Sequence, residues 1–345
     1  MREVVFAIPG DPDTLTGGYI YDKRLSRALP EHGWRVAPLR LGDGFPTPSA
    51  EEMRHAATAL AAVPADRPLV VDGLAFGALD PAAVVGIEVP LVALVHHPLA
   101  LEGGLDTAAT RAVAARERAN LAAAAAVVVT SPHTGEVLVR DYAVPPVRLT
   151  VALPGIDRPD RPAVGGAPPH VLCVGSLTAR KAHDVLLRAL ADLGDLDWRL
   201  SLVGGARDAH VAAALRDLVE TLSLRDRVRF VGELSATELR AHYAGATVFA
   251  LASRYEGYGM VFAEALSHGL PIVACRAGAV SDTVPAEAGL LVPPDDPAAF
   301  AGALRRVLSD PACHGKLSAA AWAAGRALPG WPDTAARVAA VLARL

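Results

Sequence analysis

The 345-residue sequence lacks the features of disulfide-bonded, zinc-binding or membrane-spanning proteins. Its three cysteines, Cys173, Cys275 and Cys313, are too few and too scattered for a disulfide framework or a zinc site. Cys173 and Cys275 lie inside apolar runs, which indicates buried structural thiols in a reducing cytoplasm. The longest apolar run, residues 121–129, is well short of the ~20 residues that span a membrane. We therefore expect a soluble cytoplasmic protein with no transmembrane segment, and peripheral contact with the inner membrane stays open.

The chain also lacks a strong charge of either sign and the common nucleotide signatures. A net charge of -4 and a pI near 6.3 give no general attraction to nucleic acid or anionic lipid, so we expect no nucleic-acid partner. The N-terminus leads directly into the apolar run 4–8, and no signal-peptide pattern is apparent. Neither a G-x-G-x-x-G opening the first helix nor a G-x-x-x-x-G-K-[ST] motif is present, which argues against dinucleotide oxidoreductases and P-loop enzymes.

Strand-like and helix-like segments alternate along the sequence in two successive series, one in each half of the chain. At roughly 100–200 residues per domain, the length suggests two domains. Residues 161–169, rich in Pro and Gly, predict a linker between a first domain at 1–160 and a second at 170–330. The alternation predicts an α/β protein with two Rossmann-like, doubly wound parallel sheets and a cleft between them. The predicted strands are residues 4–8, 34–41, 69–71, 91–95, 127–130, 149–153, 170–174, 199–203, 228–231, 246–252, 271–275 and 290–292.

The stretch 253–266 follows the predicted strand 246–252 and runs into a helix, so it lies at the edge of a parallel sheet where ligands bind. Its glycines allow backbone to approach a ligand, and the free N–H groups of the helix favour a phosphate. Glu256 and Glu264 stand eight positions apart. A carboxylate in the first turns is favoured by the helix dipole and can accept both hydroxyls of a ribose diol. Glu264 considered alone is better explained as an ordinary acidic residue at a helix start. Its combination with Glu256 and the glycines of the loop favours a ligand site.

The loop 176–183 follows the first strand of the second half and carries Arg180 and Lys181. A planar guanidinium next to a compact ammonium suits a diphosphate. The alternative is a solvated basic pair, although the helix dipole disfavours cations at a helix start. On this feature alone, the two interpretations are evenly matched.

Two features of the first half are candidates for ligand contact. Gly17-Gly18 opens a helix, where backbone N–H groups can meet a phosphate or sugar, although an ordinary tight turn is more probable from these residues alone. His96-His97 ends an apolar strand and is followed by Glu102. A structural and a functional histidine are equally compatible with this position. No third ligand stands at zinc spacing, so we expect no metal there.

Two D-x-D sequences have the form that metal-dependent sugar transferases use. They are Asp11-Pro12-Asp13 and Asp195-Leu196-Asp197. The first lies in a loop and the second precedes a strand at the wrong end, so we interpret both as solvated loop charge.

Taken together, these residues resemble the retaining family 4 (GT4) glycosyltransferases, which have the GT-B fold, over nearly the whole chain. The E-x7-E motif is intact as Glu256 and Glu264, and Gly17-Gly18 and His96 resemble the glycine loop and the sugar-site histidine. Further segments that resemble the family are 174–187 for the phosphates, 230–232 at the base, 278–282, 290–296 and 154–157. The resemblance also implies that the last helix, 331–345, crosses back to the first domain.

The chain departs from the family pattern at four positions, one of which is Pro154 in place of the usual Asn. Ser176 stands where the family has Arg, and Arg180 stands where it has Glu. We infer that Arg180 supplies the missing guanidinium. Asp282 replaces a glutamate and shortens that carboxylate.

The resemblance implies metal-independent transfer of a sugar from a nucleotide-diphosphate sugar, with UDP-sugars favoured, and with retention at the anomeric carbon. The implied acceptor is a small molecule, glycan or lipid, recognised by the first domain through loops such as 42–50 and 99–106. No cofactor or metal is required. The implied catalytic residues are His96, Glu256, Lys181 and Arg180. The implied donor-binding residues are Gly17, Gly18, Ser176, Val231, Gly257, Tyr258, Gly259, Met260, Val261 and Glu264.

Other functions stay open at this point. One is another GT-B reaction, such as epimerisation or phosphorolysis. A second is transfer to a thiol, an amine or a chalcogen-phosphate instead of a hydroxyl. A third is a catalytically silent nucleotide-sugar-binding protein, against which the intact Glu256, Glu264 and Lys181 argue.

Overall fold

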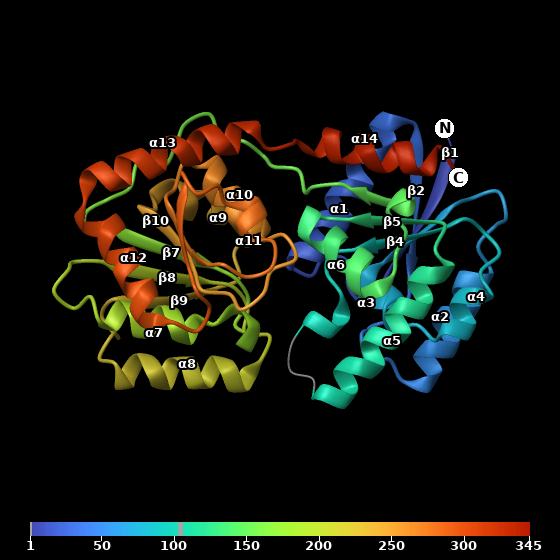
Figure 1. Cartoon of the computed structure of the whole chain (residues 1–345), viewed down its shortest axis with the longest axis horizontal. Helices are drawn as coiled ribbons and strands as arrows, with labels where there is room; N and C mark the ends of the chain where they lie inside the picture. The colour runs from blue at the N-terminus through green and yellow to red at the C-terminus, as the bar shows by residue number, and fades with distance from the viewer. Residues whose placement is uncertain (1, 103–105) are drawn as a thin grey trace. The chain divides into compact units, whose positions relative to one another are not determined.

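The structure is a computed structural model that describes residues 2–102 and 106–345, and the chain forms two compact units (Figure 1). The first unit comprises Met1–Gly155 and Pro329–Leu345, and the second comprises Ile156–Leu328. Each unit is built on a six-stranded sheet in which all neighbouring strands run parallel. The predicted fold class, with strands and helices alternating through both halves, is confirmed.

The sheet of the first unit has the strand order β2-β1-β3-β4-β5-β6. The strands are β1 (Arg2–Ile8), β2 (Trp34–Arg40), β3 (Leu69–Asp72), β4 (Leu91–Val95), β5 (Ala126–Val129) and β6 (Leu149–Val151). The three central strands β3, β4 and β5 are buried along their whole length, because both faces of the sheet are covered. Since β3 and β4 are hydrogen-bonded neighbours, the residues at their carboxyl ends lie side by side.

The helices of the first unit include two short ones that the sequence did not predict, α3 and α4. The α-helices are α1 (Gly17–Ala28), α2 (Ala50–Ala61), α3 (Gly73–Phe76), α4 (Pro81–Val85), α5 (Thr107–Ala123), α6 (Pro132–Tyr142) and α14 (Trp331–Leu342). The 3-10 turns are η1 (Leu29–His32), η2 (Leu99–Leu101) and η3 (Pro146–Arg148). Four or five residues are too few to show a helical period, which is why α3 and α4 escaped the pattern.

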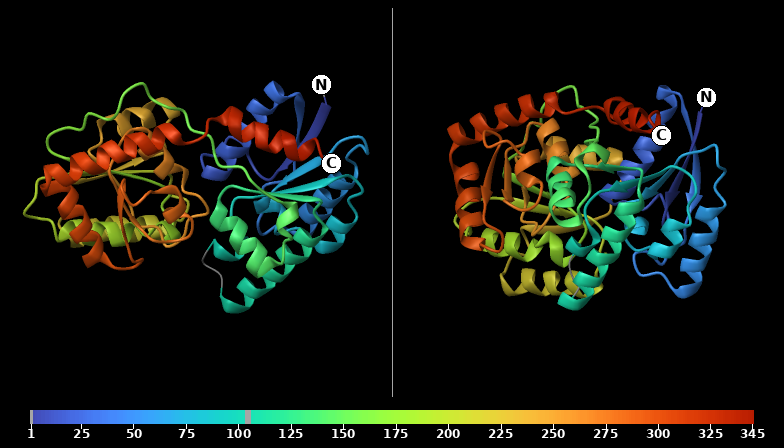
Figure 2. Two further views of the ribbon diagram at one scale, coloured as in Figure 1. Left: turned by 45° about the horizontal axis from the view of Figure 1, so that its top comes forward. Right: turned by 45° about the vertical axis from the view of Figure 1, so that its right-hand side comes forward.

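The last helix, α14, packs in the first unit, as the resemblance implies (Figure 2). The ring of Trp331 meets that of Tyr21 on α1 edge to face, with centroids 5.6 Å apart. Thr334 donates from Oγ1 to the carbonyl of Leu153 at 2.7 Å. At Gly155 a Cβ atom would lie 2.3 Å from the Trp331 backbone nitrogen, so the close approach of α14 requires glycine there.

The sheet of the second unit has the order β12-β11-β10-β7-β8-β9. Its strands are β7 (His170–Val174), β8 (Arg199–Val203), β9 (Val228–Gly232), β10 (Val248–Leu251), β11 (Ile272–Cys275) and β12 (Gly289–Val292). Its helices are η4 (Ala179–Lys181), α7 (His183–Ala191), α8 (Ala209–Thr221), α9 (Ala236–Gly245), α10 (Met260–Ser267), α11 (Val280–Thr283), α12 (Pro297–Ser309) and α13 (Pro311–Ala327). The chain leaves β7 toward β8 and returns on its other side at β10, so the loops that follow β7 and β10 are neighbours at a topological switch point.

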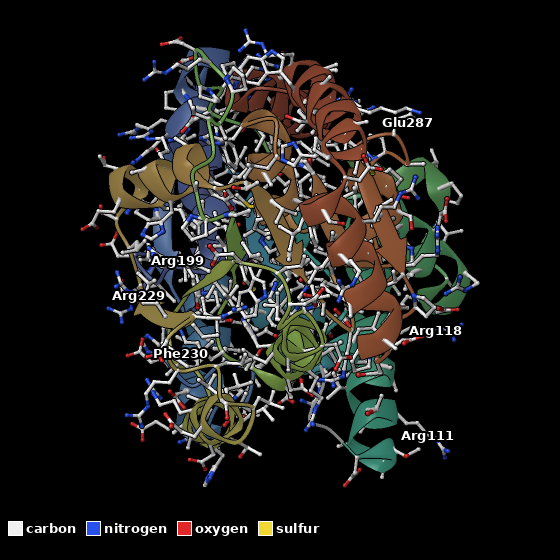
Figure 3. The ribbon with its side chains drawn as sticks, turned by 90° about the vertical axis from the view of Figure 1, so that its left-hand side faces the viewer. Arg111, Arg118, Arg199, Arg229, Phe230 and Glu287 are labelled. Carbon is white, nitrogen blue, oxygen red and sulfur yellow. The ribbon has the colours of Figure 1, made fainter. Side chains whose placement is uncertain are left out.

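The edge of this sheet at β9 is charged. Arg229 is exposed on β9, as is Arg199 at the start of β8, and Figure 3 shows both at the surface. Phe230, the next residue on β9, is half-buried, with the Arg216 guanidinium 5.3 Å from its ring centroid. Exposed arginines on an edge strand disfavour pairing with another chain.

Residues 161–169 contain no helix or strand and belong to the second unit. Their backbone is bonded to that unit, from Ala163 N to the His268 carbonyl at 2.7 Å and from Val164 N to the Ala244 carbonyl at 3.1 Å. Pro and Gly enrichment predicts irregular backbone but not the surface along which it runs. In the described part of the chain, no helix combines the length and the apolarity that crossing a membrane demands.

Candidate active site

The neighbouring loops after β7 and β10 bring two cations onto one buried carboxylate. Glu256 is 4% exposed. Its Oε1 lies 2.6 Å from Lys181 Nζ and accepts a 2.6 Å hydrogen bond from Ser253 Oγ. Its Oε2 lies 3.5 Å from a guanidinium nitrogen of Arg180. The structure therefore assembles three of the four predicted catalytic residues, and Ser253 is a member of the cluster that the sequence did not single out.

The cations decide the ionisation of Glu256. Burial by itself would raise the pKa of this carboxyl, but the charges of Lys181 and Arg180 and the hydrogen bonds from Lys181 and Ser253 hold it below its ordinary value. Glu256 is therefore a carboxylate at neutral pH. A buried carboxylate between two cations fixes their positions at the sheet edge.

Arg180 also ties the two loops together through the backbone. Its guanidinium donates to the carbonyl of Tyr255 at 3.0 Å, and the Arg180 carbonyl accepts from Arg254 N at 2.8 Å. Arg254 in turn pairs with Asp295 at 2.7 Å. The role of Arg180 as a phosphate-binding cation stays a prediction, and the structure adds a second role in which it holds the loop that carries Glu256.

The glycine-rich segment after Glu256 enters α10 through a glycine in the left-handed region. Gly259 has φ of +80° and caps the start of α10, and a Cβ atom there would lie 2.5 Å from the Phe262 ring. Met260 and Val261 form the first turn of α10, whose N–H groups have no partner within the helix. Tyr258 is buried, so of the predicted donor-binding residues it offers a ligand mainly its backbone. Gly257 lies between these residues and Glu256 and is itself buried.

Glu264 lies on α10 and is oriented by a tyrosine that the sequence analysis missed. Tyr243, on α9, donates from its hydroxyl to Glu264 Oε2 at 2.7 Å, and its ring stacks on His268 with centroids 5.1 Å apart. Burial raises the pKa of Glu264 to about 7, against the lowering effect of the Tyr243 hydrogen bond. Asp157 raises it further through its charge. At neutral pH this group lies near the midpoint of its titration.

Two predicted donor-binding residues lie at the same sheet edge without a contact to Glu256 in the described structure. Ser176 follows the carboxyl end of β7 by two positions and is half-buried. Val231 lies near the carboxyl end of β9, two strands away from β7 in the sheet, and is half-buried as well. Their roles toward a ligand stay predictions.

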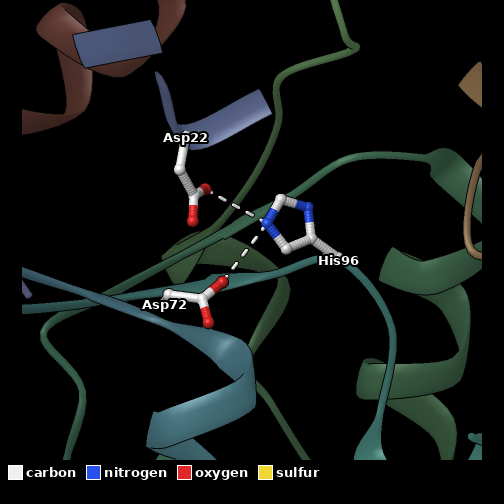
Figure 4. Close-up of side chains that lie close together, drawn as sticks. All are labelled: Asp22, Asp72 and His96. Carbon is white, nitrogen blue, oxygen red and sulfur yellow. Dashed lines mark hydrogen bonds and ion pairs between the residues drawn. The ribbon is translucent and has the colours of Figure 1, made fainter. Parts of the chain in front are cut away.

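In the first unit, His96 is held by two carboxylates that the sequence analysis did not identify (Figure 4). Its Nε2 lies 3.2 Å from Asp22 Oδ1 and 3.3 Å from Asp72 Oδ2. Asp22 belongs to α1 and is 1% exposed, and Asp72 ends β3 and is 4% exposed. Burial would lower the pKa of His96, but the hydrogen bonds and charges of both carboxylates overcome it and raise the pKa to about 10.

The predicted glycine loop contacts the same histidine. At Gly18, a Cβ atom would lie 3.2 Å from His96 Cδ2, so the absence of a side chain lets the ring lie against α1. Gly17, the first residue of α1, is exposed. The neighbouring His97 pairs with Glu102 through its ring nitrogen.

The first-unit cluster is also the group in the described residues, 2–102 and 106–345, whose ligand atoms are close enough to hold a metal. The sequence argument against a metal at His96 rested on the lack of a third ligand at short spacing. That argument fails here because Asp22 and Asp72 come from distant segments. The distances nevertheless match hydrogen bonds from an imidazole N–H to two carboxylates, so we assign a proton to His96 Nε2. We do not interpret the group as a metal centre.

The D-x-D sequences are surface charge. Asp13 pairs with Lys23, and its side chain is 73% exposed. Asp195 pairs with Arg305 at 2.6 Å, with a side chain that is 61% exposed. Neither belongs to a group of side chains within reach of a common ion in the described part of the chain.

Two Rossmann-like parallel sheets in one chain, with a cation pair and a helix start at the switch point of the second, are the arrangement of a GT-B fold. Residues 168–310 match the family model described as glycosyl transferases group 1. Residues 168–310 thus form a glycosyl transferases group 1 domain, as the E-x7-E resemblance predicted.

Known proteins agree in both sequence and fold. A D-inositol 3-phosphate glycosyltransferase of Kineococcus radiotolerans is 31% identical over 283 residues, which make up 72% of this chain and 64% of that relative's length. The solved structure of sucrose-phosphate synthase from Thermosynechococcus elongatus superposes with a TM-score of 0.84 at 24% identity, covering 100% of this chain and 99% of the other. The Anabaena protein Alr3699/HepE, solved in complex with UDP and glucose, gives a TM-score of 0.78 at 18% identity over 100% of both chains. The predicted GT-B fold is confirmed.

Proposed function

We propose that the chain is an active retaining glycosyltransferase that moves a sugar from a nucleotide-diphosphate sugar to an acceptor without a metal ion. The observation that carries the proposal is the convergence of Lys181 and Arg180 on Glu256 at the carboxyl ends of the adjacent strands β7 and β10. The start of α10 follows in the same segment. The glycosyl transferases group 1 domain makes a glycosyltransferase activity the first expectation, and this cluster gives it a physical basis.

The cation pair suits a diphosphate leaving group. An ammonium has three N–H donors, and Glu256 accepts from one of them, so Lys181 keeps donors for phosphate oxygens. Its side chain is 12% exposed, which keeps a path to a ligand while excluding most water. In such surroundings a fixed cation and free helix N–H groups stabilise the charge that develops as the diphosphate leaves. These groups take the place of a divalent ion in the proposed reaction.

Glu264 is the proposed ribose anchor. An ionised carboxylate accepts two hydroxyl protons at once, and Tyr243 fixes the direction of this one. The segment 230–232, at the end of β9, is the proposed contact for the base. UDP is the favoured nucleotide, with support from the fold neighbour solved with UDP and glucose.

The chemistry of Glu256 favours same-face displacement over a covalent intermediate. Retaining glycosidases use a free carboxylate as nucleophile, whereas both oxygens of Glu256 are occupied by cations or hydrogen bonds. In the proposed step the bond from the anomeric carbon to the phosphate oxygen breaks. A bond to the acceptor oxygen forms on the same face, and the acceptor proton passes to the leaving phosphate. His96 is proposed to contact the sugar during this step.

The cytoplasmic location is part of this proposal, and it agrees with the free thiols of the three cysteines, two of which are buried. An inositol phosphate is a rational first acceptor, because the relative from Kineococcus radiotolerans is named for D-inositol 3-phosphate.

Transfer assays test the proposal. The purified chain is incubated with UDP-, GDP- and ADP-sugars, with and without EDTA, and with hydroxyl, thiol and amine acceptors that include inositol phosphates. We expect release of a nucleoside diphosphate that is insensitive to EDTA, and a product whose anomeric configuration by NMR equals that of the donor. Lys181→Ala and Glu264→Ala should abolish it, while Lys316→Ala, at an exposed position on α13, should not. Inversion, dependence on a metal, or full activity in Lys181→Ala would each contradict the proposal.

A further inference from the structure

The imidazole of His96 has an unusual set of neighbours. A single ring nitrogen, Nε2, lies within hydrogen-bond distance of two carboxylates from different elements, Asp22 on α1 and Asp72 at the end of β3. Figure 4 shows the other ring nitrogen on the side of the ring that faces away from both carboxylates. The His96 side chain keeps 19% of its surface exposed, whereas both carboxylates are almost fully buried. The exposed part of this cluster is therefore the ring.

The geometry fixes where the first proton lies. A neutral Nε2 without a hydrogen would point its lone pair at two carboxylate oxygens, which repels all three groups. An N–H at Nε2 instead serves both oxygens. Two buried negative charges at 3.2 and 3.3 Å then favour a second proton at Nδ1, because the cation is the form that they stabilise.

The surrounding residues hold the ring in this one orientation. Asp72 is fixed by a 3.0 Å hydrogen bond from Leu74 N to its Oδ1, which leaves its Oδ2 for His96. Thr130 donates to the His96 carbonyl at 3.2 Å and fixes the backbone. The ring of Tyr21 meets the imidazole edge to face, with centroids 5.2 Å apart. Each contact reduces the freedom of the ring to turn.

We propose that Asp22 and Asp72 are positioning residues that keep His96 doubly protonated and cationic, so that its Nδ1–H is a fixed hydrogen-bond donor to a substrate oxygen. The inference rests on the proposed function for the identity of that substrate, a sugar or an acceptor hydroxyl. It does not depend on that function for the state of the histidine. His96 is the residue that touches substrate, and the two carboxylates act through it.

Two chemical consequences follow. A histidine that already carries both protons cannot accept one, so His96 is excluded as the base that takes the acceptor proton, and the leaving phosphate remains its destination. Two carboxylates and one imidazolium together carry one negative charge. The cluster can therefore donate a hydrogen bond without placing net positive charge beside an anomeric carbon that itself becomes positive.

The groups that face the ring support a cationic state over a wide pH range. The α1 helix contributes Asp22, with the phenol of Tyr21 at the ring, and β3 contributes Asp72. The groups that reach the His96 backbone are the neutral hydroxyls of Thr130, which follows β5, and of Thr134 on α6.

The cluster gains a further proton at lower pH. Burial, followed by the charge of Asp72, raises the pKa of Asp22 to about 7. Asp22 therefore takes up a proton as the pH falls through about 7, and His96 loses its proton near pH 10.

The test is NMR of the histidine side chains in the whole chain labelled with 15N-histidine, over pH 6 to 11. The signal of His96, one of 11 histidines, is assigned by its loss in His96→Gln. We expect an imidazolium signal that persists to about pH 10. Asp22→Asn and Asp72→Asn should each lower the pKa of His96 by about 1–3, because each removes one opposite charge. Both substitutions keep the shape of the side chain, and asparagine also keeps the cap on Leu74 N.

The same variants are then assayed for transfer across pH. We expect the alkaline limb of kcat to move to lower pH by the same amount as the His96 titration, with KM for the donor changed less than twofold. Asp80→Asn, at an exposed helix start of the same unit, is the matched control and should move neither. A purely structural role for the carboxylates would instead lower the thermal midpoint and leave the pH profile of the remaining activity in place.

Three results distinguish a failure of the inference about His96 from a failure of the proposed function. A wild-type His96 that is neutral at pH 8 overturns the inference, whatever the activity. Stoichiometric binding of Zn²⁺ or Mn²⁺ that is lost in Asp22→Asn would overturn it in favour of a metal centre. If the wild type transfers no sugar from any donor, the proposed function fails, and the His96 titration in the wild type still decides the state of the histidine.

Discussion

Replacing Lys181 by methionine removes the ammonium that lies 2.6 Å from Glu256 Oε1 and keeps a side chain of similar length. Glu256 then has Arg180 at 3.5 Å as its remaining cation, together with the Ser253 hydroxyl. Removing one partner of a buried ion pair costs about 3–5 kcal/mol, because a buried charge loses its compensation. Since Arg180 remains in place, we expect a value near the lower end, about 3 kcal/mol.

The pH dependence of this loss can be worked out from Glu256. In the wild type its pKa is held below the ordinary value, so it adds stability that is present above about pH 4.5 and is lost as the pH falls through the lowered pKa. In Lys181→Met the pKa of Glu256 should rise, because burial still raises it and Lys181 no longer lowers it. Glu256 then contributes less stability than in the wild type, and the difference grows as the pH rises. The deficit of the variant is therefore largest near pH 8 and shrinks toward pH 4.

Thermal unfolding at pH 5, 6, 7 and 8 measures the deficit. For a unit of this size, about 3 kcal/mol lowers the midpoint by about 6–12 °C. Lys316→Met is the matched control, because Lys316 is an exposed lysine on α13 and should shift the midpoint little at any pH. A deficit no larger than that of Lys316→Met, or one that grows on acidification, would refute the assignment of Lys181 as the principal counter-charge of Glu256.

Three further predictions concern residues around Glu256 and Glu264 in the second unit. Tyr243→Phe deletes the hydroxyl that donates to Glu264, so the pKa of that carboxyl should rise above 7. Calorimetry at pH 7 should then show nucleoside diphosphate binding weakened by about tenfold, or about 1.4 kcal/mol. Equal affinity in the variant would contradict a role for Tyr243 in the ribose site. In the wild type, the same titration should show tighter binding at pH 8 than at pH 6, because the ionised form of Glu264 accepts the ribose hydroxyls, and a flat profile would count against a diol at this carboxylate. Gly278→Ala puts a Cβ atom 2.3 Å from the Glu256 carbonyl oxygen at φ of +57°, so the thermal midpoint should fall by about 4 °C or more, and an unchanged midpoint would show that this contact can relax.

Much of the second-unit site could be predicted from the sequence, because its signals are local. The buried parallel strands appear as short apolar runs, and the loops that follow them carry the charges. Lys181 and Glu256 each stand a few residues after such a run, so placing both strands in one sheet brings their loops to one edge. Their direct pairing at 2.6 Å also depends on β7 and β10 being adjacent strands, which neither segment reveals by itself.

The first-unit cluster could be predicted only in part, because its members are far apart in the chain. Asp22 lies in a helix with charged neighbours at 23 and 24, where a buried carboxylate cannot be told from a solvated one. Asp72 carried a usable signal, since it is the first polar residue after the apolar run 69–71 and stands at the carboxyl end of a strand. The missing information was that β3 and β4 pair, which places Asp72 next to the strand that ends before His96.

Tyr243 was missed for the same reason. It lies in the last turn of a helix of mixed polarity, and its hydroxyl reaches Glu264 only because α9 and α10 pack against the same sheet. Ser176 differs from Tyr243, because here the family motif by itself indicates that a cation is missing. The structure places Arg180 against Glu256 and the Tyr255 carbonyl.

The central claim is that the second unit binds the diphosphate of a nucleotide sugar through Lys181 without a metal. Calorimetric titration of UDP, GDP and ADP into the whole chain in the presence of EDTA tests it directly. We predict saturable binding of at least one nucleotide, weakened by tenfold or more in Lys181→Met and unchanged in Lys316→Met. No binding of any nucleotide in EDTA, or equal affinity in wild type and Lys181→Met, would contradict the account.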